Sequence, residues 1–158
     1  MKCGRHRRGF SLIELLVVLS IIMIISAIAI PNLVRSKMAA NEASAVGSIR
    51  ALNGACIAYS STFGIGFPSA LSNLGPGKPA TAATADLVDS VLAAGTKSGY
   101  KLTYVSGAPK SGTITTYTIN ANPVAPSVTG IRYFFTDQTG VIRTSTGSAA
   151  TVASPPIG

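Results

Sequence analysis

The chain of 158 residues is 47% hydrophobic and only 11% charged, with a formal net charge of +8. Four of its thirteen basic residues lie within the first nine positions, and the other nine, opposed by five acids, are scattered without a basic stripe. This distribution argues against nucleic-acid binding, which needs a basic groove interleaved with aromatic side chains.

A basic leader over 1–9 precedes an apolar run over 10–30, which only Glu14 and three serines interrupt. As a helix, this run would be about 30 Å long, enough to cross one hydrocarbon core. Because positive charge before a membrane helix stays on the cytoplasmic side, we expect a single-pass protein with its N-terminus inside.

Glu14 decides between two ways of processing this segment. A secretory signal peptide would be cut near Ala29 and would release a secreted binding domain. Cleavage after Gly9 would instead keep the apolar run and create an α-amine on Phe10, four residues before Glu14. A carboxylate near a bilayer edge costs about 1–3 kcal/mol without a partner. The new amine could neutralise Glu14 within the chain or from a neighbouring chain, so cleavage after Gly9 is favoured.

The sequence Gly9-Phe10-Ser11-Leu12-Ile13-Glu14-Leu15, set between a basic leader and an apolar run, resembles the class III signal of type IV pilins and type II secretion pseudopilins. The resemblance implies cleavage after Gly9 by a prepilin peptidase, N-methylation of Phe10, and extraction from the membrane into a helical filament. It also implies that Glu14 pairs with the N-terminus of a neighbouring subunit during assembly. Pro31 stands where the family also places a proline.

The same resemblance implies partners and locations. The partners are other copies of the chain, the prepilin peptidase, an inner-membrane platform protein, an assembly ATPase and an outer-membrane secretin. The protein would lie in the bacterial inner membrane before assembly, and then in an extracellular filament or a periplasmic pseudopilus.

The helix is expected to continue over 31–63, giving one element of about 80 Å from residue 10 onward. Pro31 lacks an N–H, so the carbonyl of Ala27 loses its donor and we expect a kink there. Apolar residues recur at helical spacing on one face, namely Val34, Met38, Ala45, Ile49, Leu52, Cys56, Tyr59 and Phe63. The other faces carry Arg35, Lys37, Asn41, Glu42, Ser48 and Asn53.

A loop region is expected over 64–99, because glycines and a proline end the helix near 64–68. Within it, Thr84 can cap a short helix over 85–94. Asp86 and Asp89 are interpreted as acids at the start of that helix rather than as metal ligands.

Strand signals follow over 100–144. Residues 100–104 alternate, residues 113–119 are rich in β-branched side chains, and Asp137-Gln-Thr-Gly140 is a turn that would join two strands as a hairpin. These signals predict a three- or four-stranded antiparallel sheet packed on the helix, an α+β, pilin-like fold. The tail over 145–158, rich in Thr, Ala, Ser and Pro, is expected to be flexible.

No combination of residues supports catalysis, because the only histidine is His6, in the leader, and the sequence has no paired carboxylates and no phosphate-binding loop. We therefore expect a structural subunit, without metal or cofactor, that polymerises through the helix over 10–63. A pseudopilin is the alternative, but no acid follows Asp137 to form the calcium site of major pseudopilins. A minor pilin at the filament tip, with an adhesive or DNA-uptake head, is a further possibility. Cys56, the one cysteine left after cleavage, is interpreted as a core residue.

Overall fold

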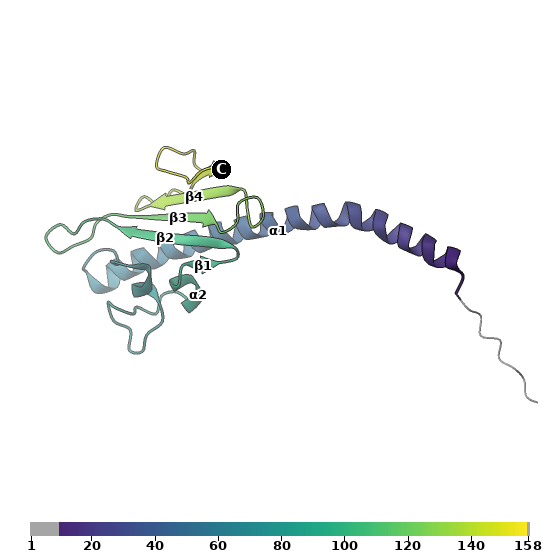
Figure 1. Ribbon diagram of the computed structural model, residues 1–158. Coiled ribbons are helices and arrows are strands. Elements are labelled where there is room, and N and C mark those ends of the chain that lie inside the picture. The colour runs from purple at the N-terminus through teal and green to yellow at the C-terminus, as the bar shows by residue number, and fades with distance from the viewer. Residues whose placement is uncertain (1–9, 158) are drawn as a thin grey trace, which may run out of the picture. The chain divides into compact units, whose positions relative to one another are not determined.

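The computed structural model describes residues 10–157 of the chain. Its elements, in chain order, are helix α1 (Leu12–Phe63), 3-10 helix η1 (Leu71–Leu74), helix α2 (Ser90–Ala93), and strands β1 (Thr96–Lys97), β2 (Tyr100–Ser106), β3 (Tyr117–Pro123), β4 (Arg132–Asp137) and β5 (Arg143–Thr146) (Figure 1). They form two compact units, one ending at Ser36 and the other beginning at Lys37.

Helix α1 is the longest element and takes part in both units. The apolar stripe predicted on one of its faces is buried from Ala45 to Tyr59, and Ile49, Leu52 and Cys56 are fully enclosed. These side chains share one core cluster with buried residues of the sheet, including Tyr100, Tyr117, Ile119 and Phe134. The first member of the stripe, Val34, is instead 43% exposed and lies in the first unit.

The strands form one antiparallel meander in the order β1-β2-β3-β4-β5. Buried and half-buried residues alternate strictly along β3, as expected for a sheet with one face on a core. The α+β prediction is therefore confirmed, but the sheet has five strands where three or four were expected. The additional strand, β1, has only two residues, too few to give an alternating pattern in the sequence.

The short helix expected over 85–94 is reduced to the four residues of α2. Asp89 rather than Thr84 caps it, because the Asp89 carboxylate accepts a hydrogen bond from the Leu92 N–H at 2.6 Å. Earlier helical turns do not form, since the backbone N–H groups of 85–88 donate to carbonyls of residues 73–75 instead. Thr84 pairs with Thr81 in a turn.

The expected turn over 137–140 is present, closed by the Gly140 N–H donating to the Asp137 carbonyl at 2.9 Å. The tail, expected to be flexible, is hydrogen-bonded to the sheet as far as residue 157. Its N–H and carbonyl groups pair with β5 and the residue before it, through Thr144 N–H to Pro155 O at 2.9 Å and Ile157 N–H to Ile142 O at 2.9 Å. Ala150 is buried. These contacts place the tail along the otherwise open edge of β5.

Candidate functional site

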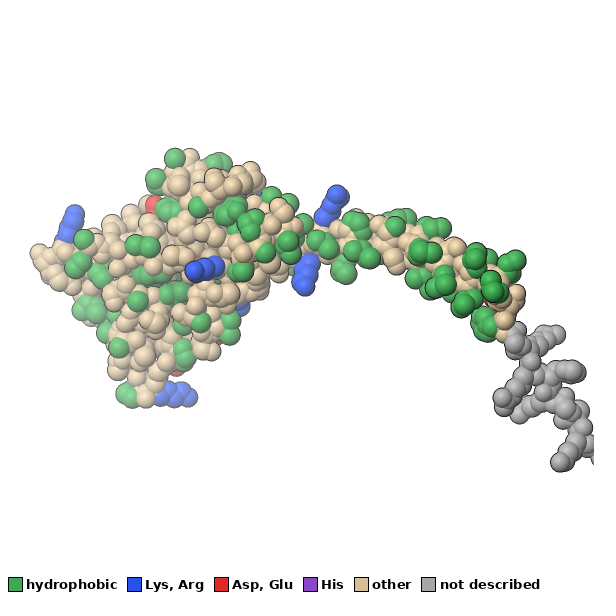
Figure 2. Space-filling model, viewed as in Figure 1, with side chains coloured by type: hydrophobic (Ala, Val, Ile, Leu, Met, Phe, Trp, Pro, Cys, Tyr) green, Lys and Arg blue, Asp and Glu red, His purple; other side chains and the backbone are tan. Residues whose placement is uncertain are grey.

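The first candidate site is the apolar part of α1 within the unit that ends at Ser36. Hydrophobic side chains cover much of the face of this segment that Figure 2 shows, and Leu12, Ile13 and Leu33 are 82%, 72% and 69% exposed. By length and composition α1 can cross a membrane. Such a surface is not stable in water and needs lipid or protein around it.

Glu14 is the acidic residue in the first turn of α1, and its side chain is exposed. Within residues 10–157 the ion pairs join Lys97 to Asp89 and Arg132 to Glu42, so Glu14 has no cationic partner in this part of the chain. An acid in a first turn suits the helix dipole, and Ser11 and Glu14 have the spacing of a capping box. These local effects are worth about 1 kcal/mol, less than the upper end of the cost of a lone carboxylate at a bilayer edge.

Phe10 lies just before the helix and is 78% exposed. The first helical hydrogen bond runs from the Leu15 N–H to the Ser11 carbonyl at 3.2 Å, so α1 begins at Leu12 rather than at Phe10. Phe10 and Glu14 therefore do not share a regular helix face in this chain, which still carries its leader. Gly9, the other residue of the predicted cleavage junction, lies outside the described residues.

Pro31 lies inside α1, and the helix continues on both sides of it. Two polar side chains of the apolar segment donate hydrogen bonds to backbone carbonyls of the same helix, four residues earlier. Ser20 Oγ donates to the Leu16 carbonyl at 2.8 Å, and Asn32 Nδ2 donates to the Ile28 carbonyl at 3.1 Å. Hydrogen bonds of polar side chains within the helix suit a helix in lipid, where no water is present to replace a missing partner. The kink predicted at Pro31 stays a prediction.

Sequence reasoning missed a second feature, the set of polar contacts that hold α1 on the sheet. Glu42, expected on a polar face of the helix, is buried at 7% exposure. It accepts hydrogen bonds from Ile131 N–H at 2.8 Å, Arg132 N–H at 3.1 Å and Arg132 Nε at 2.7 Å. Burial by itself raises the pKa of Glu42, but these hydrogen bonds and the Arg132 charge outweigh it and hold that pKa below its ordinary value.

Asn53 was also expected on a polar face and is buried as well. It bridges two buried hydroxyls, donating to Thr136 Oγ1 at 3.1 Å and accepting from the Tyr117 hydroxyl at 3.1 Å. The partners lie 83 and 64 residues away in sequence. No local pattern reports such a pairing, so helical periodicity could not have identified it.

Nothing in the described part of the chain offers a metal site, because no three His, Cys, Asp or Glu side chains gather there. Cys56 is buried, and that burial raises the pKa of its thiol to about 12, against a smaller opposite effect of a hydrogen bond with Tyr104. This thiol is therefore a core group rather than a nucleophile.

Comparison with known proteins identifies one family model, described as the prokaryotic N-terminal methylation motif, which matches residues 4–30. Comparison with curated proteins and with solved structures gave no significant match. The chain carries a class III prepilin signal, typical of type IV pilins and pseudopilins, on a pilin-like α+β fold. Proteins of this kind are typically structural rather than enzymatic.

Proposed function

We propose that the protein is a structural subunit of a type IV pilus-like filament, matured by prepilin peptidase and polymerised through α1. The observation that carries the proposal is an apolar helix segment, exposed on all sides, with Glu14 as its one acid and a prepilin signal at its start. At about 25 cal/mol for each Å² of apolar surface, leaving this segment in water would cost tens of kcal/mol. Lipid removes that cost before assembly, and other copies of the helix remove it afterwards.

Cleavage after Gly9 and N-methylation of Phe10 would leave a charged amine beside this segment. Because α1 begins at Leu12, the geometry supports pairing of Glu14 with the amine of a neighbouring copy over pairing with the amine of its own chain. Two charges that neutralise each other at a fixed position would set the register between subunits, since a shifted register leaves both unpaired in an apolar surrounding.

The proposed route needs several partners in sequence. Prepilin peptidase would act on the membrane-inserted precursor at the cytoplasmic side, and an inner-membrane platform protein with an assembly ATPase would drive extraction. A secretin would pass an extracellular filament through the outer membrane. The protein would thus change from a single-pass inner-membrane protein to a filament subunit.

Two measurements on the protein from a strain that has the assembly machinery test this function. Mass spectrometry of the mature chain should give a start at methylated Phe10, whereas a start near Ile30 would show an ordinary secreted domain. Replacing Glu14 by Val should leave the protein in the membrane and reduce the amount of sheared filament at least tenfold. Wild-type filament yield from Glu14→Val would contradict the proposed role of this acid. A matched control is Ser20→Ala, which removes a polar group of the same segment without touching a charge.

A further inference from the structure

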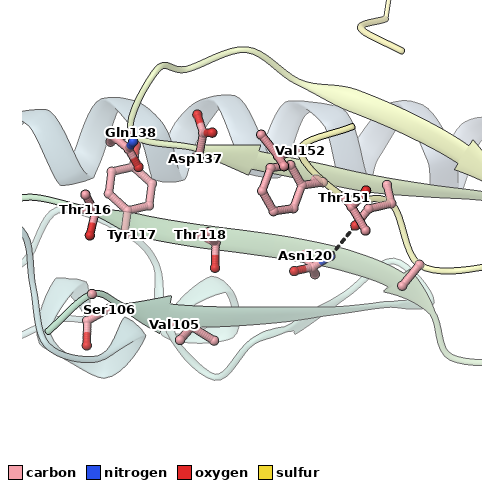
Figure 3. A pocket seen from close by; sticks show the side chains of 14 residues that line it. Val105, Ser106, Thr116, Tyr117, Thr118, Asn120, Asp137, Gln138, Thr151 and Val152 are labelled. Carbon is pink, nitrogen blue, oxygen red and sulfur yellow. Dashed lines mark hydrogen bonds between the residues drawn. The ribbon is translucent and has the colours of Figure 1, made fainter. Parts of the chain in front are cut away.

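A groove of about 630 Å³ lies on the outer face of the sheet, between β2, β3 and β4 and the tail residues 149–152 (Figure 3). Val105 and Phe135 contribute its apolar surface, and Thr118 and Asn120 contribute polar groups. The Asn120 amide also donates to the Ala150 carbonyl at 2.9 Å, which fixes the tail as one wall. The lining includes one acidic residue, Asp137, and no Lys or Arg.

Asp137 has one carboxylate oxygen available. Its Oδ1 accepts hydrogen bonds from the Thr139 N–H and hydroxyl, whereas Oδ2 has no partner among residues 10–157. The unit from Lys37 onward contains eight basic and four acidic residues, and two of those acids are already paired within the chain. Heads packed side by side therefore repel one another unless cations of one copy meet free acids of another.

A projection that carries a lysine stands next to this groove, and the base of the projection lines the groove. Residues 107–116, here called the finger, connect β2 to β3 (Figure 1) as a narrow hairpin. Gly107 N–H donates to the Thr116 carbonyl at 2.8 Å, and Lys110 and Thr113 exchange backbone hydrogen bonds of 2.9 and 3.0 Å. A tight turn through Ser111 and Gly112, at φ of 51° and 82°, leaves Lys110 exposed beside the tip. These backbone hydrogen bonds hold the hairpin without a partner, and a preformed projection loses less entropy on contact.

We propose that this groove receives the finger of another copy of the chain, with the Lys110 ammonium against Asp137 Oδ2. Of its own finger, the groove is lined only by the base, Gly107 and Thr116, so a finger tip seated in it would belong to a second molecule. Finger and groove are different surfaces, and a contact between different surfaces repeats from copy to copy, so it builds an open filament unless the rotation closes into a ring. The inference rests on the proposed function, because it assigns a contact between heads within the filament.

Cysteine cross-linking tests the contact directly. Gln138 lines the groove beside Asp137 and has no hydrogen bond in the described part of the chain, so Gln138→Cys leaves the Asp137 turn intact. In filaments of Lys110→Cys, Gln138→Cys, mild oxidation should give a ladder of disulfide-linked multimers on a non-reducing gel. The control pair Lys101→Cys, Gln138→Cys should give monomer. Filaments of the first pair that yield only monomer would overturn the proposed contact while leaving the filament function standing. Absence of filaments from the wild-type chain would refute the filament function itself.

Charge reversal gives an independent test. Asp137→Lys and Lys110→Asp should each lower the yield of sheared filament, by up to about fivefold for one ion pair. The double variant should restore the yield. Restoration shows that positions 110 and 137 interact, and the cross-linked ladder shows that they do so between copies. Failure of Lys110→Asp to restore the yield, or restoration by Lys78→Asp instead, would overturn the assignment of Lys110.

Discussion

Glu42 and Arg132, 90 residues apart in sequence, form a partly buried ion pair that attaches α1 to the first residue of β4. The same carboxylate accepts the backbone N–H groups of Ile131 and Arg132. The Arg132 guanidinium also lies 5.5 Å from the centre of the Phe134 ring, a cation–π geometry. This pair connects the helix to the sheet close to Lys37, where the second unit begins. A subunit pulled through its helix would depend on that connection.

Replacing Glu42 by Gln should destabilise the second unit by about 1–2 kcal/mol. The amide oxygen can still accept the two backbone N–H groups, but the charged hydrogen bond from Arg132 Nε is lost. Glu42→Ala should cost more, about 3 kcal/mol, because it leaves those donors without an acceptor. Urea unfolding of the full chain in detergent, followed by circular dichroism, measures both. Arg50→Gln, an exposed change on the same helix, is the control and should have no effect. Equal stability of Glu42→Ala and wild type would contradict a stabilising role of the contacts between Glu42 and β4.

The lowered pKa of Glu42 makes the stabilisation of the second unit by this carboxylate depend on pH. In the unfolded chain the carboxyl titrates near its ordinary value of 4.5, and in the folded chain it titrates below that value. The stabilisation is therefore complete above about pH 5 and is lost as the pH falls through the folded pKa. The stability difference between wild type and Glu42→Gln should be constant from pH 5 to 7 and should shrink below pH 4.5. A difference that instead grows on acidification would have the wrong sign for this assignment.

The sequence predicted the fold class and the apolar face of α1, because both depend on short-range periodicity and length. It did not predict that Glu42 and Asn53 are buried, since helical period alone places polar residues on the solvent face. Their burial depends on donors and acceptors that only the folded sheet brings near. The β-branched run over 113–119 was likewise expected to be a strand, but regular pairing begins at Tyr117. Residues 113–116 instead form the second side of the finger hairpin.

The hydrogen bonds that Asn53 makes with Tyr117 and Thr136 should couple the effects of these three residues on stability. Asn53→Leu leaves the Tyr117 and Thr136 hydroxyls buried without partners and should cost about 2–4 kcal/mol. Adding Tyr117→Phe and Thr136→Val removes both unpaired hydroxyls, so the triple variant should be more stable than Asn53→Leu alone. Urea unfolding of wild type, Asn53→Leu and the triple variant measures the differences in stability. A triple variant less stable than the single one would mean that packing at these positions, rather than hydrogen bonding, determines their contribution.

Cys56 should report on whether the second unit is folded. Its side chain is fully buried, and burial raises the pKa of the thiol to about 12. At pH 8 the native mature protein should therefore react with a thiol reagent at least 100-fold more slowly than the urea-unfolded protein. Rapid labelling of the native protein would show that α1 separates readily from the sheet. The same slow reaction keeps Cys56 from interfering with cross-linking between residues 110 and 138.

Gly47 and Gly54 lie seven residues apart on the exposed face of α1, and a Cβ atom added at either position would meet nothing within 4 Å. A glycine in a helix interior is about 1 kcal/mol less favourable than alanine, so Gly47→Ala and Gly54→Ala should each stabilise the monomer by about 0.5–1 kcal/mol. Within the described residues no close contact requires either glycine, whereas a neighbouring chain packed closely on this face would. If a neighbouring copy in the proposed filament packs closely on this face, filament yield should fall in the same variants whose unfolding midpoint in urea rises. Ala43→Ser, an exposed change on the same stretch of helix, controls for a general effect of altering this surface. A variant that is both more stable and fully able to assemble would show that no copy approaches the helix closely at these two positions.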